Sequence, residues 1–381
     1  MTNTEGVKIL QLINDLVIHE DRCNLHCQYC LAAESPFRSR ETRAVVSNRS
    51  DPQSLRYGFG SLLKCQLDDV LAHYGQFFDA PILKISGGEA FLVSGLSALV
   101  KRSLDSYESV QILTNGTLLS ERTLRTLAKL PGVHLQVSID GHDLAMNRLR
   151  VPSQRLHRAL LSNLDRAVAF GIPLEVFCVL HACNADYIAD FADYLLERFN
   201  GTVGLTPFPV RGSEAANLAP GPEQDVGIDR LIAYFDHYRA ILPPLVYLRH
   251  LKQIAFERRP RQTQCFVPLV MLQCFEDGAV TPCPYSWVEE TGNLANCPQD
   301  VANGFGNTAG YRIRRQNPPR AAFCRSCITD AYPLSLFFNH DIGFTDLSHN
   351  RPIFGRPRAQ ARLLELLARF DADSDVGSIT Q

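Results

Sequence analysis

The sequence lacks an excess of either charge. It has 381 residues, with 38 Lys and Arg against 40 Asp and Glu, and its formal net charge is -2 at pH 7. Basic and acidic residues are interspersed, and such a surface has no field that would gather nucleic acid or an anionic membrane. We therefore expect neither nucleic acid nor a membrane among the partners.

The sequence also lacks a targeting or membrane segment. Residues 1–8 are polar and include Glu5, so they do not have the basic start and long apolar run of a secretory signal. No apolar stretch approaches the about 18 residues that a membrane span needs. This predicts a cytoplasmic protein. Because thiols stay reduced in the cytoplasm, the 12 cysteines are expected to bind metal rather than form disulfides.

Three of the cysteines stand close together near the N-terminus. Cys23, Cys27 and Cys30 fall within eight residues, a spacing that has no packing reason among buried cysteines. A structural zinc ion takes four ligands, whereas an iron–sulfur cluster held by three cysteines leaves one iron open. The triplet therefore predicts an iron–sulfur cluster at which chemistry can start.

The same run, with Tyr29 before the last cysteine, resembles the CxxxCxΦC signature of the radical SAM superfamily, in which Φ is aromatic. The resemblance implies a 4Fe–4S cluster whose open iron chelates the amino and carboxylate groups of S-adenosylmethionine (SAM). It implies that one electron, from a donor such as flavodoxin or ferredoxin, cleaves SAM to a deoxyadenosyl radical. That radical would take hydrogen from a substrate carbon.

Short apolar runs alternate with amphipathic stretches between residues 10 and 206. Helical patterns run from Leu67 to Phe77 and from Leu156 to Phe170, the second followed by Gly171 as a C-cap. Such alternation predicts a parallel sheet and an α/β fold, here a partial (β/α)6 TIM barrel like that of radical SAM cores. The predicted strands are Leu10–Ile18, Pro81–Ser86, Val110–Thr114, Leu135–Ile139, Leu174–Leu180 and Val203–Thr206.

Polar groups follow the ends of three predicted strands. Gly87, Gly88 and Glu89 form a GGE motif after the second strand, and paired glycines let a backbone approach a ligand closely. In radical SAM proteins this motif receives the amino group of SAM. The resemblance further implies SAM-binding roles for Tyr29, Thr114, Asn115, Ser138 and Asp140, and a pairing of Arg150 with the SAM carboxylate, with Arg148 as the competing choice.

A second set of cysteines lies towards the C-terminus: Cys265, Cys283, Cys324 and Cys327. Twelve residues separate Cys265 from Gly278, and four more precede Cys283. This spacing resembles the opening of the SPASM and twitch extensions. No cysteine follows Cys327, so the resemblance implies one auxiliary 4Fe–4S cluster, the twitch arrangement, serving as an electron conduit or a structural anchor. A zinc ion bound by four thiolates is the alternative.

These patterns divide the chain into four predicted parts. Residues 1–225 form the radical SAM core, 226–261 a helical connector, 262–330 a twitch/SPASM-like domain that binds the auxiliary cluster, and 331–381 a C-terminal extension to which the sequence assigns no function.

Three other cysteines are candidate hydrogen donors to a substrate radical: Cys183, Cys274 and Cys297, each of which is otherwise an ordinary thiol. The first functional hypothesis is an oxidoreductase or epimerase. It would dehydrogenate or epimerise an alcohol-bearing carbon of a sugar or aminocyclitol in natural-product biosynthesis. The second is a peptide maturase that crosslinks or epimerises residues of a ribosomally made precursor. The third is a non-catalytic iron–sulfur or zinc protein.

Overall fold

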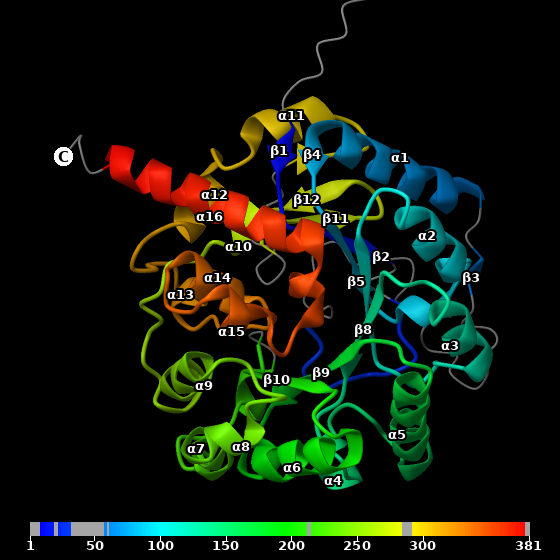
Figure 1. Ribbon diagram of the computed structural model, residues 1–381, viewed down its shortest axis with the longest axis vertical. Coiled ribbons are helices and arrows are strands. Elements are labelled where there is room, and N and C mark those ends of the chain that lie inside the picture. The colour runs from blue at the N-terminus through cyan, green and yellow to red at the C-terminus, as the bar shows by residue number, and fades with distance from the viewer. Residues whose placement is uncertain are drawn as a thin grey trace, which may run out of the picture.

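The computed structural model describes residues 8–18, 22–31, 57–58, 61–211, 215–283 and 292–377. Its main strands are β2 (Ile13–Ile18), β5 (Ile82–Gly87), β7 (Ser109–Thr114), β8 (Val133–Ser138), β9 (Leu174–Leu180), β10 (Gly204–Pro209), β11 (Met271–Phe275), β12 (Ala279–Thr281) and β13 (Gly292–Asn293). Within the described ranges they form one nine-stranded sheet in the order β10-β9-β8-β7-β5-β2-β11-β12-β13 (Figure 1). Every neighbouring pair from β10 to β11 is parallel.

All six predicted strands are present and follow one another across the sheet in chain order, from β2 to β10. The predicted α/β fold with a partial (β/α)6 barrel is confirmed. The last strand is longer than predicted, because it continues past Thr206 through Pro207 to Pro209. Proline lacks an N–H to donate, but β10 is an edge strand, where that loss is tolerated.

The first predicted strand is divided in two. β1 (Ile9–Leu10) pairs with β4 (Phe78–Asp79), and only then does β2 join the main sheet. The break falls at Gln11 and Leu12, whose N–H groups donate to the carbonyl oxygens of Asp79 at 2.9 Å and Val270 at 2.8 Å. The backbone therefore changes partners at this point. A further short parallel pair joins β3 (Tyr57–Gly58) to β6 (Val93–Ser94).

Helices surround the sheet (Figure 1). The patterns expected from Leu67 to Phe77 and from Leu156 to Phe170 lie in α1 and α5, and Gly171 after α5 has a φ of 69°. No helix of the described residues has the length and apolar character to span a bilayer. The α-helices are α1 (Ser61–Phe77), α2 (Leu96–Ser103), α3 (Glu121–Leu127), α4 (Leu144–Asn147), α5 (Gln154–Ala169), α6 (Ile188–Phe199), α7 (Val226–Ala233), α8 (Phe235–Tyr238), α9 (Leu245–Leu251), α10 (Val267–Val270), α11 (Pro298–Gly304), α12 (Ala309–Arg314), α13 (Ala322–Arg325), α14 (Tyr332–Phe338), α15 (Phe344–Ser348) and α16 (Pro357–Gly377).

The cysteine-rich segment contributes a strand to the barrel sheet. β11 pairs with β2 in parallel, from Met271 opposite Ile13 to Phe275 opposite Val17, and β12 and β13 extend the sheet in antiparallel fashion. The start of the segment 262–330, for which the sequence predicts a twitch/SPASM-like domain, is joined to the first barrel strand by a continuous hydrogen-bond ladder.

A layer of polar side chains crosses the inside of the barrel. Gln273, Asp15, Lys84 and Gln111 lie opposite one another on four successive strands. Gln273 donates to Asp15 at 3.3 Å, and Gln111 donates to Glu175 at 2.8 Å. All five side chains are buried. The barrel is therefore packed at this depth, and open space for a substrate has to lie nearer the carboxyl ends of the strands.

The C-terminal part of the chain completes this layer. Asp330 pairs with Lys84 at 3.5 Å. Arg351 Nε lies 3.1 Å from Glu175 Oε2 as an ion pair, and Arg351 Nη2 donates to Glu175 Oε1 at 3.4 Å. From α16, Arg362 donates to the carbonyl oxygen of Gln11 at 2.7 Å, at the amino end of the barrel. Residues of the predicted C-terminal extension thus pack inside the barrel and cover its amino end.

We predict that Arg351→Met lowers the free energy of unfolding by about 3 kcal/mol, because it leaves the Glu175 carboxylate buried without its cation. Urea unfolding of the anaerobic holoprotein measures the change. Arg369→Met on the exposed side of α16 is the matched control and should change stability by less than about 0.5 kcal/mol. Equal losses in the two variants would contradict the prediction.

Candidate active site

The three N-terminal cysteines lie on a loop that follows β2 at the carboxyl end of the sheet, the end at which parallel α/β barrels carry their active groups. The neighbouring β5 ends in Gly87, which has a φ of 133°. A Cβ atom there would stand 2.0 Å from the carbonyl oxygen of Ile18. Only glycine lets the GGE turn approach the end of β2 this closely.

The thiols of the loop lie near one another. Burial raises the pKa of Cys27 to about 11, with Cys30 and Asp140 adding to the rise and Arg150 opposing it. Burial, Glu89, Cys27 and Cys30 raise the pKa of Cys23. These mutual effects and the hydrogen bond from the Cys30 N–H to the Cys27 carbonyl oxygen at 3.1 Å indicate that the three cysteines lie near one another. The donor set therefore suits a cluster held by three thiolates.

Glu89 joins the GGE turn to the end of β7. Its fully buried carboxylate accepts hydrogen bonds from Thr114 Oγ1 at 2.7 Å, from the Asn115 N–H at 2.8 Å and from the Phe91 N–H at 3.1 Å. The N–H of Glu89 in turn donates to the carbonyl oxygen of Arg22, directly before the first cysteine. Gly88 between them is half-buried. Glu89 and Thr114 therefore orient the turn and the cysteine loop towards each other.

Asn115 reaches the cysteine loop itself. Its side-chain nitrogen donates to Asn24 Oδ1 at 2.9 Å and to Cys23 Sγ at 3.6 Å. Asn24 then donates to Thr117 Oγ1 at 2.8 Å. The sequence singles out Asn115 as a SAM ligand but not Asn24, and the only signal for Asn24 is its place between two cysteines.

Asp140 is the centre of a second, fully buried network. Its carboxylate accepts from Tyr29 Oη, from Arg150 Nε and Nη2 at 3.2 Å each, and from the Val179 N–H at 3.0 Å. Burial raises the pKa of a carboxyl group, but Arg150 and His181 outweigh that effect and lower the pKa of Asp140. Asp140 therefore holds the aromatic residue of the cysteine motif against β8 and β9.

The two candidate arginines have different surroundings. Arg150 is buried with its guanidinium 5.4 Å from the Tyr29 ring centre, and its charge opposes the rise in the pKa of Cys27. Arg148 is exposed and donates to Cys183 Sγ from Nη2 at 3.0 Å and from Nε at 3.3 Å. Arg150 thus packs beside Tyr29 of the cysteine loop, and Arg148 lies at the edge of that loop. Ser138, half-buried, is the last residue of β8.

The other four cysteines come from separate elements. Cys265 precedes α10, Cys283 follows β12, and Cys324 and Cys327 lie in and after α13. Burial raises the pKa of Cys324 to about 12, with Cys327, Cys265 and Cys283 adding to the rise, so the four thiols lie together. In the part of the chain that the structure describes, no group of three or more His, Cys, Asp or Glu side chains could hold a single metal ion. Four thiolates at one place suit a 4Fe–4S cluster, with zinc as the alternative.

The three candidate hydrogen donors are far from equivalent. Cys183 is half-buried against the apolar group of Tyr29, Leu149 and Val179. Cys274 is fully buried and alternates along β11 with Gln273, so it faces away from the polar layer. Cys297 is exposed at the start of α11, which packs against α1. Only Cys183 of the three lies beside the cysteine loop.

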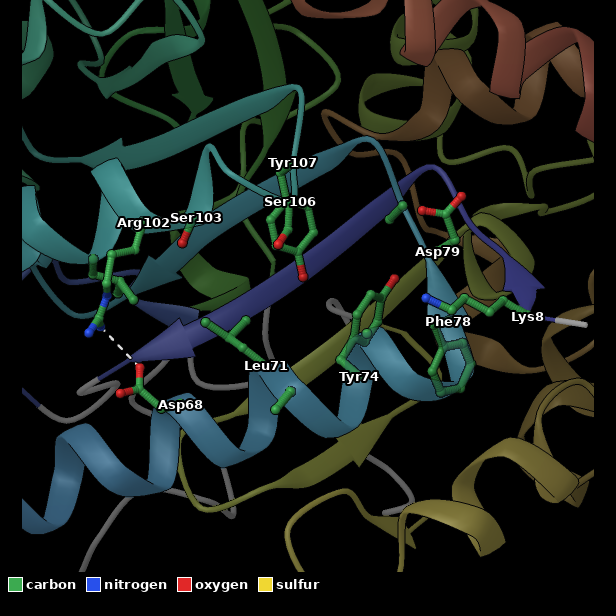
Figure 2. Close-up of a pocket in the computed structure, with 14 residues that line it drawn as sticks. Lys8, Asp68, Leu71, Tyr74, Phe78, Asp79, Arg102, Ser103, Ser106 and Tyr107 are labelled. Atoms are coloured by element: carbon green, nitrogen blue, oxygen red, sulfur yellow. Dashed lines mark hydrogen bonds and ion pairs between the residues drawn. The ribbon is translucent and has the colours of Figure 1, made fainter. Parts of the chain in front are cut away.

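A cavity of about 330 Å³ opens at the other end of the strands (Figure 2). Leu71 and Tyr74 of α1 face Tyr107, which precedes β7, and Asp68 pairs with Arg102 at its edge at 3.0 Å. The cysteine loop lies after the carboxyl end of β2, whereas residues before the amino ends of β5 and β7 line this cavity. It is therefore separate from the chemistry described above.

A family model described as the radical SAM superfamily matches residues 17–195. These residues are a radical SAM domain. Its cofactors are a 4Fe–4S cluster and SAM, and Cys23, Cys27 and Cys30 are a donor set that would fit the cluster.

Curated relatives cover the chain to different extents. A PqqA peptide cyclase of Streptomyces rochei is 26% identical over 280 residues, which are 72% of this chain and 70% of that protein. The sporulation killing factor maturation protein SkfB of Bacillus subtilis (strain 168) is 24% identical over 171 residues. Those residues are 45% of this chain and only 36% of SkfB.

Two solved structures share the fold. SuiB of Streptococcus suis bound to S-adenosylmethionine has a TM-score of 0.55 at 14% identity and covers 79% of this chain and 67% of SuiB. Native anSMEcpe with bound AdoMet and the Cp18Cys peptide has a TM-score of 0.54 at 14% identity. That alignment covers 94% of this chain and 99% of the other, so it includes the residues after the radical SAM domain.

We predict about eight iron atoms per chain after anaerobic reconstitution, since two 4Fe–4S clusters account for that number. Replacing Cys23, Cys27 and Cys30 together by alanine should leave about four, and so should replacing Cys265, Cys283, Cys324 and Cys327. Cys297→Ala is the control and should keep the full number. About four irons with bound zinc in the unmodified chain would rule out the auxiliary cluster.

Proposed function

We propose that this radical SAM enzyme removes hydrogen from a carbon of a peptide and so crosslinks, oxidises or epimerises a residue of that peptide. The observation that carries the peptide assignment is the relationship to the PqqA peptide cyclase, which spans 72% of this chain. The second relative, SkfB, is likewise named as a maturation protein.

The residues of the chain prepare the site for this chemistry. When bound, the cluster and SAM supply a one-electron cleavage whose product, a deoxyadenosyl radical, removes a hydrogen atom from the substrate. Glu89 and Asp140 hold the two sides of the cysteine loop through buried hydrogen bonds. Leu149 and Val179 give that loop an apolar border, which limits the access of water.

The remaining SAM contacts are part of the proposal. The GGE turn, with Gly87 and Gly88, would receive the amino group of SAM through its backbone. Ser138 would reach the ribose. Arg150 already neutralises Asp140, so its pairing with the SAM carboxylate would add to an existing ion pair. A flavodoxin or ferredoxin would supply the electron.

The second candidate function is dehydrogenation or epimerisation of an alcohol-bearing carbon in a sugar or aminocyclitol. It is favoured by the single auxiliary set, which ends at Cys327 and resembles the twitch arrangement. In this reaction the auxiliary cluster would take up the electron that oxidation releases.

Deuterium transfer distinguishes the two substrate classes. We expect a deuterated precursor peptide, encoded next to the gene, to transfer deuterium to 5′-deoxyadenosine during turnover under reducing conditions. Mass spectrometry of the nucleoside measures the transfer, and Cys27→Ala, which removes a cluster ligand, should abolish it. Transfer from a deuterated sugar or aminocyclitol and from no peptide would replace the peptide proposal by the second candidate.

We further propose Cys183 as the donor for a reaction that returns hydrogen to the substrate. Its S–H bond would break to form the substrate C–H bond, and one electron from the flavodoxin or ferredoxin with one solvent proton would restore the thiol. Its thiol exchanges with solvent, so turnover of an epimerising enzyme in D₂O should place one deuterium in the product. Cys183→Ser should lose that label, whereas Cys297→Ser, an exposed thiol remote from the loop, should keep it. Retention of the label by Cys183→Ser would assign the donor role to another group.

A further inference from the structure

Arg261 is a buried cation beside the auxiliary cysteines. Only 3% of its surface is exposed. Its backbone N–H donates to the carbonyl oxygen of Arg325 at 2.6 Å, and its Nη1 donates to the carbonyl oxygen of Cys327 at 3.2 Å. These two bonds tie Arg261 to both ends of the segment from Cys324 to Cys327.

Two further donors of Arg261 have no partner. Nε and Nη2 are buried and make no hydrogen bond within the described residues. Burying an unsatisfied N–H is unfavourable, and the free-energy cost is greater for a charged group. The two hydrogen bonds that Arg261 makes to carbonyl oxygens are enough to hold the loop. They do not explain why Nε and Nη2 are buried without an acceptor.

The surroundings identify what the fork faces. Because Nη1 bonds to the Cys327 carbonyl oxygen, the guanidinium lies at the segment that carries Cys324 and Cys327. On its other side the guanidinium lies 5.9 Å from the centre of the Tyr332 ring. An aromatic ring has no lone pair that could accept an N–H hydrogen bond. An acceptor that would satisfy the Nε and Nη2 donors of this cation here is an anionic group that contains sulfur.

We propose that Arg261 donates its Nε and Nη2 hydrogens to the auxiliary cluster held by Cys265, Cys283, Cys324 and Cys327, and so raises the reduction potential of that cluster. Reduction adds negative charge to a cluster. A cation and directed N–H donors in a buried site stabilise the reduced state more than the oxidised one. Arg261 acts as a positioning residue and does not touch the substrate.

The proposal rests on the auxiliary cluster and not on the identity of the substrate. Its test uses the full chain with Cys23, Cys27 and Cys30 replaced by alanine, so that only the auxiliary cluster contributes to the spectrum. Arg261→Met and Arg261→Lys are introduced into this background. Arg259→Met is the matched control, because Arg259 lies two residues away, is 70% exposed and pairs with Glu257.

The readouts are iron content and the midpoint potential from a redox titration followed by electron paramagnetic resonance. Arg261→Met should make reduction at least tenfold less favourable, about 59 mV for one electron. Arg261→Lys should fall between, because lysine keeps the charge but not the planar fork. Arg259→Met should match the parent.

Equal potentials in all loaded variants would overturn the proposal. If Arg261→Met fails to fold, as circular dichroism would show, Arg261→Lys decides alone, and the parent potential in that variant overturns the proposal. If the parent itself binds no iron, the auxiliary cluster and this role of Arg261 are both wrong. Peptide-dependent SAM cleavage by the unmodified chain is measured separately and would still test the proposed function.

Discussion

The site depends on the buried carboxylate of Asp140. A charge in this position is stable only when donors surround it, and its donors come from three different parts of the chain. Tyr29 comes from the cysteine loop, Arg150 from the segment after α4, and the Val179 N–H from β9. Because one carboxylate needs all of them, satisfying it fixes the loop against the barrel. On the opposite side of the loop the buried carboxylate of Glu89 is surrounded in the same way, with Thr114 and Asn115 as donors.

The two networks explain why the loop has a defined shape. The described part of the loop, residues 22–30, lies in neither a helix nor a strand. The residues that hold it, Glu89, Asn115 and Asp140, follow the ends of β5, β7 and β8. Rigid strands position these groups better than a loop could, and preorganised polar groups lose little on ligand binding. The barrel therefore holds the cysteine loop in position.

Much of this arrangement is readable in the sequence, because the signals are local. The cysteine spacing, the GGE motif and the alternation of strands and helices each lie within a short window, and all six core strands were predictable. Long-range pairings were not. Tyr29 and Asp140 are 111 positions apart, and nothing near either residue indicates that a carboxylate expected to bind SAM would hold the motif tyrosine.

Other features could have been read only with the register in hand. Cys274 and Gln273 face opposite sides of β11, so one position decides whether a thiol lines the barrel or the outer core. The prolines of β10 indicate a connector unless the strand is known to be an edge. Arg261 stands four residues before Cys265, but its unpartnered donors are a property of the folded environment alone.

The pairing of β11 with β2 has a consequence for synthesis of the chain. β2 is made among the first 20 residues, whereas its neighbour on one side does not emerge until residue 275. Until then β2 is an apolar edge strand with an unpaired row of backbone groups, which is a template for association with other chains. The nascent barrel therefore exposes this edge until β11 is made, and residues 276–381 follow after the edge is covered.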